Sequence, residues 1–554
     1  MTTLSWWKTI FFLCVFCAVE AILSPAQTFK TLINFDGTDG YHPAGLVQGI
    51  DGNFYGTTYE GGTSCAGVGG CGTAFKITPA GKLTTLYSFC AITNCTDGAS
   101  PHAGLVQATD GDLYGTTSSG GANGHGTVFK ITPAGKLTRL YSFCAKTNCT
   151  DGSAPYAGLV QATDRNFYGI TNEGGNTSEL CPVGCGTVFE ITPAGKLTTL
   201  HSFDVTDGSG VNGLVQATNG NFYGTTSFGG ANALGTVFEI TPTGTLTTLY
   251  RFCSETNCTD GYYPYAGVVQ ATDGNFYGTT SHGGAYGWGT VFKITPTGTL
   301  TTLHSFDVTD GTSAAPLVQA TDGNFYWTTA SGGANGDGTV VKITPGVTLT
   351  LTTLHSFDVT DGTSAAPLVQ ATNGTFYGIT YGGGAEDYGT VFSLSVGLGP
   401  FVEALTYSGK VGNTIEFLGQ DFTSSTTVSF NGKAAIRKLV SGTYLTATVP
   451  SGATTGFVTV KTSGGTLNSN KIFRVIPQIT SFSPASGPVG TSVTITGETL
   501  AGATSVAFDG VEAKFTVGSY TRITAVVPKG AKTGKIEVTT PGGTATSVGT
   551  FTVK

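Results

Sequence analysis

Charged residues are scarce in this sequence. They make up 11% of its 554 residues, whereas ordinary domains contain about 25%, and glycine alone contributes 84 residues. We therefore expect a surface built mainly from Thr, Ser, Asn and Gly, as in many extracellular proteins. The net charge is −8 and no basic stripe is present, so no nucleic acid partner is expected.

Long apolar runs are also lacking after residue 26. None reaches the 18 or more residues typical of a membrane-spanning helix, so we expect no transmembrane span in the mature chain. The amino terminus has Lys8, an apolar stretch over residues 10–22 and the small residues Ser24-Pro-Ala26. These features predict a signal peptide over residues 1–26 and a secreted or cell-surface protein. Lipidation at Cys17 is the alternative, although Phe16 is bulkier than the usual lipoprotein cleavage pattern accepts.

Catalytic motifs are missing as well. The sequence has no His-Glu-x-x-His, no Gly-x-Ser-x-Gly and no phosphate loop. It therefore predicts no cofactor and no catalytic residues, and it favours a binding protein over an enzyme.

Residues 27–397 consist of seven copies of one cassette. Successive anchors are 49 to 59 residues apart, at or just above the range of about 20–50 residues for solenoid and propeller repeats. The second copy contains four strand-like runs, at residues 105–108, 113–118, 127–132 and 137–143, and no helical period. The anchors are Gly45-Leu-Val-Gln, Gly104-Leu-Val-Gln, Gly158-Leu-Val-Gln, Gly213-Leu-Val-Gln, Gly267-Val-Val-Gln, Pro316-Leu-Val-Gln and Pro367-Leu-Val-Gln.

The ends of the repeat region predict how it closes. One fourth-strand segment, residues 31–35, precedes the first anchor, and the last cassette ends at residues 389–394 without one. We predict that residues 28–35 pair with residues 389–394, because closure removes exposed sheet edges. The predicted fold is all-β: a seven-bladed β-propeller of four-stranded blades over residues 27–397, closed by the amino-terminal strand.

The cassette also resembles a known family. Its segments Gly-Leu-Val-Gln-Ala-Thr, Asn-Phe-Tyr-Gly-Thr-Thr and Gly-Thr-Val-Phe-Lys-Ile-Thr-Pro are similar to the GloVer tandem repeats of bacterial surface or secreted proteins. The resemblance implies secretion and a propeller-like body. It brings no established activity and no catalytic residues.

The carboxy-terminal region resembles a second family. Residues 477–554, with Pro477-Gln-Ile-Thr-Ser-Phe-Ser-Pro and Val493-Thr-Ile-Thr-Gly, are similar to the IPT/TIG immunoglobulin-like fold. Residues 398–476 repeat this pattern loosely and lack the opening motif. We expect two β-sandwiches, which the resemblance implies act as spacers or binding units.

Ten cysteines remain after the predicted signal peptide, in five close pairs. Local disulfides that staple longer loops are the expected state in a secreted chain. Zinc binding is the alternative, although the Cys-x₂-Cys spacing of many zinc sites is absent. The pairs are Cys65/Cys71, Cys90/Cys95, Cys144/Cys149, Cys181/Cys185 and Cys253/Cys258.

Tyrosine recurs at one position of all seven cassettes, and glutamine recurs at another. Sevenfold repetition predicts a structural role, namely packing and buried hydrogen bonding between blades. A third position is Gly in most cassettes but Trp327 in the sixth, and we expect local repacking around this tryptophan. The recurrent residues are Tyr55, Tyr114, Tyr168, Tyr223, Tyr277, Tyr326 and Tyr377, and Gln48, Gln107, Gln161, Gln216, Gln270, Gln319 and Gln370.

One face of the predicted ring is variable in length and composition. Because strands alternate in direction, the first-to-second and third-to-fourth turns form a uniform face, and the other connections form the opposite, variable face. Binding sites favour variable loops on a rigid scaffold, although ordinary loop packing is the alternative for each residue. The candidate ligand-binding residues there are Tyr41, His42, His102, His125, Tyr156, Phe228, Tyr263, Tyr265, His282, Tyr286, Trp288 and Tyr388.

Acidic residues recur in the same connections. Each connection contains an Asp in a Thr-Asp-Gly segment, and four copies have a further Asp three residues earlier. These side chains offer oxygen ligands for calcium, but Asx turns explain each Asp more simply. His201, His304 and His355 replace Tyr87, Tyr141 and Tyr250, so they are expected to be interchangeable aromatic residues rather than ligands. The Asp residues are Asp39, Asp97, Asp151, Asp207, Asp260, Asp310 and Asp361, and Asp36, Asp204, Asp307 and Asp358.

The sequence favours a secreted or cell-surface binding or adhesion protein. The variable face would contact a glycan or protein outside the cell, and the sandwiches would act as spacers. We expect a monomer. A propeller lyase or glycoside-active enzyme and a purely structural surface protein are the alternatives. Two or more acids or histidines within ~3–7 Å of one another in the central funnel would favour the enzyme, and the absence of both such a cluster and a pocket would favour the structural protein.

Overall fold

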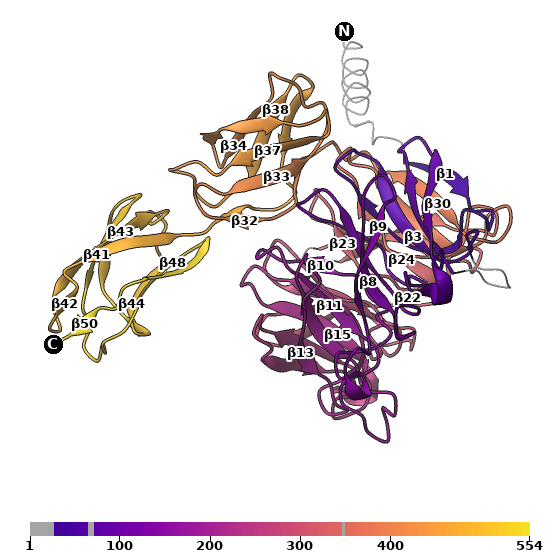
Figure 1. The fold of residues 1–554 in the computed structure, drawn as a ribbon, viewed down its shortest axis with the longest axis horizontal. Coiled ribbons are helices and arrows are strands. Elements are labelled where there is room, and N and C mark those ends of the chain that lie inside the picture. The colour runs from indigo at the N-terminus through magenta and orange to yellow at the C-terminus, as the bar shows by residue number, and fades with distance from the viewer. Residues whose placement is uncertain (1–26, 65–70, 346–348) are drawn as a thin grey trace, which may run out of the picture.

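The computed structural model describes residues 27–64, 71–345 and 349–554. The predicted signal peptide and Cys65 lie outside the described residues. The described chain is all-β (Figure 1). Its helical segments are three 3-10 turns, η1 (Thr93–Cys95), η2 (Thr147–Cys149) and η3 (Thr256–Cys258).

Each cassette folds into one antiparallel sheet, and we number these repeat sheets 1 to 7 along the chain. Repeat sheet 1 contains β2 (Tyr41–Gln48), β3 (Phe54–Glu60), β4 (Thr73–Ile77) and β5 (Leu83–Ser88); sheet 2 contains β6 (Val106–Gln107), β7 (Leu113–Thr117), β8 (Thr127–Ile131) and β9 (Leu137–Ser142). Sheet 3 contains β10 (Val160–Gln161), β11 (Phe167–Thr171), β12 (Thr187–Ile191) and β13 (Leu197–Ser202); sheet 4 contains β14 (Ser209–Gln216), β15 (Phe222–Phe228), β16 (Thr236–Ile240) and β17 (Leu246–Arg251). Sheet 5 contains β18 (Val269–Gln270), β19 (Phe276–Thr280), β20 (Thr290–Ile294) and β21 (Leu300–Ser305).

The last two repeat sheets have a first strand that is broken into two pieces. Sheet 6 contains β22 (Thr312–Ala314), β23 (Val318–Gln319), β24 (Phe325–Ser331), β25 (Thr339–Thr344) and β26 (Thr350–Ser356); sheet 7 contains β27 (Thr363–Ala365), β28 (Val369–Gln370), β29 (Phe376–Gly382), β30 (Thr390–Ser395) and β1 (Thr28–Asn34). Pro316 and Pro367 lie at the breaks, where a proline has no backbone N–H for the ladder.

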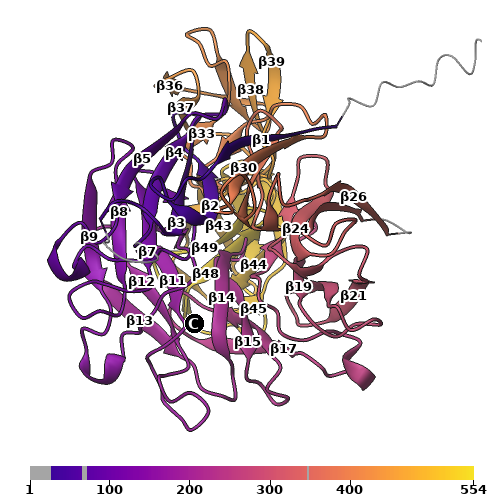
Figure 2. The ribbon, with the colours of Figure 1, turned by 90° about the vertical axis from the view of Figure 1, so that its right-hand side faces the viewer.

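The predicted pairing of the two ends of the repeat region is observed. β1 runs antiparallel to β30, from Thr28 opposite Ser395 to Asn34 opposite Thr390. Figure 2 shows β1 beside β30, although the two strands lie at opposite ends of the repeat region. The amino-terminal strand thus completes the sheet that the last cassette leaves without an outer strand.

The recurrent glutamines join each repeat sheet to the one before it. The Gln161 Oε1 accepts a hydrogen bond from the Thr109 N–H at 2.9 Å, and equivalent bonds recur in every sheet. The Gln48 Oε1 accepts one from the Thr372 N–H at 2.9 Å, which joins sheet 1 to sheet 7. The predicted bonding role of these glutamines is confirmed.

The recurrent tyrosines pack between repeat sheets, as predicted. The Tyr114 ring stacks on Phe167 of the next sheet with centroids 4.0 Å apart. Five other tyrosines pack on the phenylalanine of the next sheet with centroids 4.0 to 4.4 Å apart, two of them stacked and three tilted. One of these contacts, between Tyr377 and Phe54 at 4.1 Å, again joins sheet 7 to sheet 1. Tyr55 packs in a cluster with Leu113, which replaces the phenylalanine in sheet 2.

Trp327 shows how the core accommodates one departure from the repeat. A Cβ atom added to Gly56, its counterpart in sheet 1, would lie 2.5 Å from the Phe75 ring. In sheet 6 the residue opposite Trp327 is Val341 instead of Phe, and Trp327 is 0% exposed. The large tryptophan thus fills the space that a smaller partner leaves, which confirms the predicted repacking.

The carboxy-terminal region forms two units with the same strand order, which we call tail sandwich 1 and tail sandwich 2. Sandwich 1 contains β31 (Glu403–Ala404), β32 (Ser408–Gly409), β33 (Thr414–Leu418), β34 (Thr427–Phe430), β35 (Lys433–Ala435), β36 (Arg437–Leu439), β37 (Tyr444–Thr448), β38 (Val458–Thr462), β39 (Gly465–Asn468) and β40 (Arg474–Val475). Sandwich 2 contains β41 (Gln478–Ser483), β42 (Ser486–Gly487), β43 (Ser492–Glu498), β44 (Ser505–Phe508), β45 (Val511–Glu512), β46 (Phe515–Ser519), β47 (Arg522–Val526), β48 (Ile536–Thr540), β49 (Gly543–Thr546) and β50 (Thr552–Val553). Each has its own buried core, so the loose first repeat of the pattern folds like the second.

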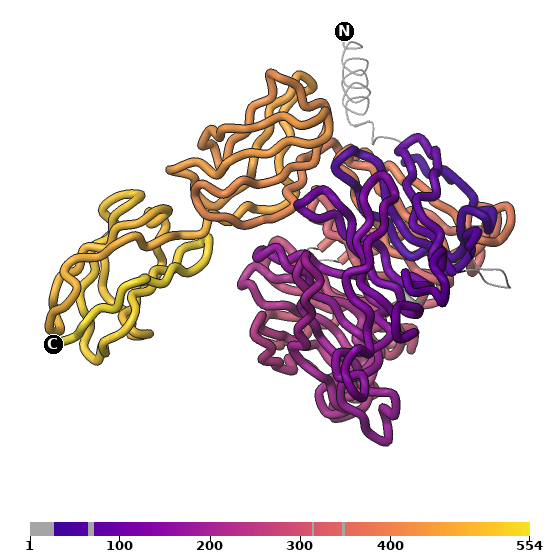
Figure 3. The backbone as a smooth tube through the Cα atoms, viewed as in Figure 1, coloured from indigo at the N-terminus to yellow at the C-terminus, as the bar shows by residue number. Residues whose placement is uncertain are grey.

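Tail sandwich 1 contacts the uniform face of the repeat body. The Thr443 hydroxyl donates to the Ile50 carbonyl at 2.9 Å, and the Phe401 N–H donates to the Thr372 carbonyl at 2.9 Å. Arg474 donates to the Thr218 carbonyl. All three acceptors lie in turns between the first and second strands of their sheets. Figures 1 and 3 show sandwich 1 beside the repeat body and sandwich 2 farther out along the chain.

Candidate functional site

Disulfides close several of the loops on the variable face. Four of the five predicted pairs are present, namely Cys90–Cys95, Cys144–Cys149, Cys181–Cys185 and Cys253–Cys258. The fifth pair includes Cys65 and stays a prediction. The oxidised pairs fit an extracellular environment, and their sulfurs are not the thiolates that bind zinc.

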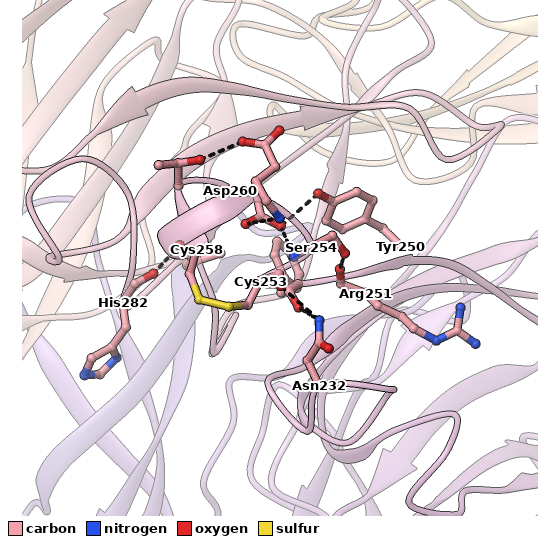
Figure 4. The surroundings of a disulfide bond; sticks show 12 residues. Asn232, Tyr250, Arg251, Cys253, Ser254, Cys258, Asp260 and His282 are labelled. Carbon is pink, nitrogen blue, oxygen red and sulfur yellow. Dashed lines mark hydrogen bonds between the residues drawn. A yellow bond between two sulfur atoms is a disulfide. The ribbon is translucent and has the colours of Figure 1, made fainter.

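A buried carboxylate lies under each of the three loops closed by Cys90–Cys95, Cys144–Cys149 and Cys253–Cys258. Asp260 accepts hydrogen bonds from the Tyr250 hydroxyl at 2.8 Å and the Ser254 N–H at 2.9 Å, beside the Cys253–Cys258 disulfide (Figure 4). Asp97 and Asp151 have the equivalent tyrosine partners, Tyr87 and Tyr141. These aspartates are 0–1% exposed, so they hold the loops and cannot meet a ligand directly.

Histidine takes the place of tyrosine in three shorter connections. The His201 Nε2 lies 2.8 Å from Asp207, and the His304–Asp310 and His355–Asp361 pairs have the same arrangement at 2.6 and 2.8 Å. The sequence-based interpretation of these histidines as interchangeable aromatic residues is confirmed.

The additional aspartates of the short connections close Asx turns. The Asp204 Oδ1 accepts hydrogen bonds from the Thr206 N–H and hydroxyl and from the Asp207 N–H. The same pattern occurs at Asp36, Asp307 and Asp358. Hydrogen bonding from Thr38 lowers the pKa of Asp36, as expected for a carboxylate that is held in its charged form.

At the variable face, sheets 1 and 7 bring together four aromatic residues and a glutamate. We call this group the seam cluster: Tyr41, His42, Glu60, Tyr381 and Tyr388. The His42 and Tyr381 rings stack 3.9 Å apart at 3°, and the Tyr41 and Tyr388 centroids are 5.2 Å apart. The His42 Nδ1 lies 3.6 Å from a Glu60 carboxylate oxygen. Tyr41 and His42 belong to β2, so they lie in a strand and not in a loop as the sequence predicted.

The electrostatics of the seam cluster keep its imidazole neutral. Burial lowers the pKa of His42, although the carboxylates of Glu60 and Asp387 oppose this shift. Burial and then Glu60 raise the pKa of Tyr41 to about 12. The cluster therefore places a neutral imidazole and neutral phenol rings beside the carboxylates of Glu60 and Asp387.

A second group of rings continues across sheets 1 to 3. The Tyr59 and His102 centroids are 4.0 Å apart, and His102 meets Tyr156 edge-on at 4.4 Å. Burial lowers the pKa of His102 to about 4. The charge of Glu173 adds to burial in raising the pKa of Tyr156, so a carboxylate lies near this group too.

A third aromatic group lies on sheets 4 and 5. Phe228 packs edge-on against Tyr263 at 5.2 Å, Tyr263 lies 6.1 Å from Tyr265, and Tyr262 stacks on His282 at 5.3 Å. Tyr265 remains 52% exposed. In the described contacts, no carboxylate lies beside these rings, unlike in the first two groups.

The other candidates are not brought into these groups. Tyr286 and Trp288 are 66% and 46% exposed. His125 Nδ1 lies 2.9 Å from the Ser153 hydroxyl, and its ring is close to the Cys144–Cys149 sulfurs. Sequence reasoning missed Tyr59, Glu60, Tyr262 and Tyr381. Two of them, Tyr59 and Tyr381, are next to the last residue of the second strand, where the other cassettes have Ser, Asn or Ala, and this substitution was the available signal.

These observations define a class: a propeller-like repeat protein with an immunoglobulin-like tail, of the type found at cell surfaces. The IPT/TIG domain family matches residues 477–553. The Gloeobacter/Verrucomicrobia repeat family matches residues 21–179, 63–270 and 252–434. The chain belongs to this repeat family. In the described residues no helix is long and apolar enough to span a membrane.

The solved structures that the chain is similar to are distant in sequence. A catalytically inactive virginiamycin B lyase from Staphylococcus aureus, with quinupristin, is 14% identical over 67% of this chain and 99% of that chain, with a TM-score of 0.45. A fungal alcohol oxidase of the AA5 family, in complex with copper, is 13% identical over 81% and 98%, with a TM-score of 0.44. A surface glycan-binding protein from Prevotella bryantii is 20% identical over 27% and 41%, with a TM-score of 0.21. No curated protein matches the chain.

Proposed function

We propose that this protein is a secreted or cell-surface binding or adhesion protein, whose variable face contacts a glycan or another protein. Residues 27–397 form a closed seven-bladed propeller, and residues 398–476 and 477–554 are two spacer sandwiches. The pairing of β1 with β30 and the contacts between sheets 1 and 7 support the closed ring.

The observation that carries this proposal is that the tail contacts one face of the repeat body and the exposed aromatic rings lie on the other. Tail sandwich 1 occupies turns of the uniform face, whereas the variable face presents exposed rings, including Tyr156, Tyr265 and Tyr381 at 42%, 52% and 44%. Exposed aromatic surface of this kind is typical of contact sites. A tail attached to the opposite side leaves these rings accessible.

The experiment is a glycan and protein array with the full mature chain. We expect binding that is lost in a Tyr156→Ala, Tyr265→Ala and Tyr381→Ala variant. The matched control replaces two exposed tail residues, Ile436→Ala and Val548→Ala, which are 83% and 90% exposed, and should bind normally. Binding that survives the tyrosine substitutions but fails in the control would place the site in the tail and contradict the proposal.

A propeller enzyme is the second candidate, because the His42–Glu60 separation of 3.6 Å lies within the range expected for an acid and a base that share a substrate. In this candidate, neutral His42 would accept a proton and Glu60 would orient it. A His42→Gln variant that retains full ligand binding but loses turnover of that ligand would favour the enzyme over simple binding.

A further inference from the structure

The connections of the variable face are acidic and almost free of bases. Lys146 is their only lysine or arginine in the sequence. Asp36, Asp204, Asp358 and Asp387 are exposed there. A partner with negative charge would be repelled by this face, and a partner with positive charge would be attracted.

The seam cluster concentrates this property at one place. Glu60 is 28% exposed beside the His42 ring, and Asp387 exerts its charge on His42 from the β29–β30 connection. The ring of Tyr381 is covered by His42 on one side, and Tyr381 is 44% exposed. The cluster therefore offers an aromatic surface and carboxylate oxygens side by side, with a neutral imidazole between them.

This combination suits a ligand with two properties. The C–H face of a sugar ring packs on an aromatic surface, and an ammonium group interacts with both carboxylates and the faces of aromatic rings. A neutral sugar would leave the carboxylates without a charged partner, and a sulfated or uronic sugar would face repulsion. An amino sugar with a free amine satisfies both features.

We propose that the seam cluster binds a glycan that carries unacetylated amino sugars, with the sugar ring against Tyr381 and the ammonium group at Glu60. This proposal rests on the proposed binding function and names its ligand class. The neighbouring group of Tyr59, His102 and Tyr156 repeats the pattern of rings beside a carboxylate. It would contact a second sugar residue of the same chain.

The test compares two matched ligands on the full mature chain. A glucosamine oligomer and the N-acetylglucosamine oligomer of the same length differ in the charge of the amine, and calorimetry measures the affinity of each. We expect the charged oligomer to bind about tenfold more tightly, which corresponds to about 1.4 kcal/mol. We also expect its affinity to fall steeply between about 0.05 M and about 0.5 M salt.

Variants locate the site. Glu60→Gln should reduce affinity for the glucosamine oligomer about tenfold, whereas Asp358→Asn, an exposed acid of the same face outside the cluster, should change it less than twofold. Unchanged melting temperatures would show that both variants fold. Glu60→Gln binding that equals the wild type would overturn the assignment.

The remaining outcomes separate this inference from the proposed function. Equal affinity for the two oligomers, abolished by Tyr381→Ala, would refute the amine and leave glycan binding intact. Binding of a lysine-rich peptide with no binding of either oligomer would refute the sugar and indicate a protein partner. No binding to any of the three probes would overturn the inference, and the array would then decide the broader function.

Discussion

The two faces of the repeat body are made by the same seven cassettes but differ in what their connections contain. On the uniform face, one arrangement recurs: Asp51 accepts from the Tyr55 hydroxyl and from Lys76 at 2.9 and 2.7 Å, and sheet 5 repeats it at Asp273. On the variable face, the connections differ from one another: some contain a disulfide, some an aromatic residue and some a short acidic turn. Repetition thus marks the contacts that hold the sheets, and departures mark positions that can meet a ligand.

The largest expected effect concerns the strand that joins the two ends of the repeat. Removing residues 27–36 deletes Phe35, which is 0% exposed, and Phe29, which packs against Phe392 at 5.2 Å. Loss of one buried phenylalanine side chain costs about 3–5 kcal/mol, so we expect the melting temperature to fall by at least about 5 °C. Circular dichroism against the chain that begins at residue 27 measures this. Identical melting curves would be incompatible with a closed ring.

The next prediction concerns Trp327, the tryptophan that stands in the core where the other sheets have glycine. Trp327→Gly should destabilise the protein by about 3–5 kcal/mol, because it leaves a cavity beside Val341. Adding Val341→Phe should restore most of the loss, since this pair recreates the Gly–Phe arrangement of the other sheets. Chemical denaturation of both variants and of Val341→Phe alone completes the cycle. Additive losses in the double variant would show that the two residues do not compensate each other.

A smaller effect is expected where a ring holds a buried aspartate. Tyr141→Phe removes the 2.7 Å hydrogen bond to Asp151 and should cost about 1–3 kcal/mol. Tyr141→His should cost less, because His201 makes the equivalent bond to Asp207 in sheet 3. The two unfolding free energies are compared directly. A histidine variant that is less stable than the phenylalanine variant would refute the equivalence.

The smallest effect concerns the ionisation of Asp39. In the other connections a tyrosine or histidine contacts the equivalent aspartate, but Ile33 stands at that position for Asp39. Burial raises the pKa of Asp39 to about 6. A raised pKa in the folded state means that the stability contribution is complete below about pH 4 and is lost as the pH rises through about 6. Melting temperatures of the wild type and Asp39→Asn should therefore diverge between these pH values in favour of the variant. Parallel curves would show that Asp39 ionises normally.

Much of the fold was predictable from the sequence, because a residue that recurs at the same position in seven cassettes reflects the structure that the cassettes share. The recurrent tyrosines and glutamines, the pairing of β1 with β30 and four disulfides followed from alignment of the cassettes alone. The contact of tail sandwich 1 with the uniform face was not predictable, since its acceptors, such as the Ile50 and Thr372 carbonyls, are backbone atoms without a sequence signature.

The candidate site was predictable only in part. Tyr41, His42 and Tyr388 were recognised by their places in variable connections, and they do lie together. Tyr381 and Glu60 were missed because they lie within the ends of strands β29 and β3, whereas the candidates were taken from the connections between strands. Trp288 and Tyr286 were recognised by residue type, but the described contacts do not place them in the aromatic groups. Which rings meet depends on neighbouring sheets, and a single cassette does not contain that information.

The proposed function requires the ligand to bind at the variable face, on the side of the repeat body opposite tail sandwich 1. Hydrogen–deuterium exchange of the full mature chain, with and without the strongest array ligand, measures where the ligand binds. We predict slower exchange on binding in residues 37–44, 57–63 and 380–389, and no change in the turns at 49–53 and 371–375, which lie under tail sandwich 1. Protection confined to those turns or to residues 398–554 would contradict the account.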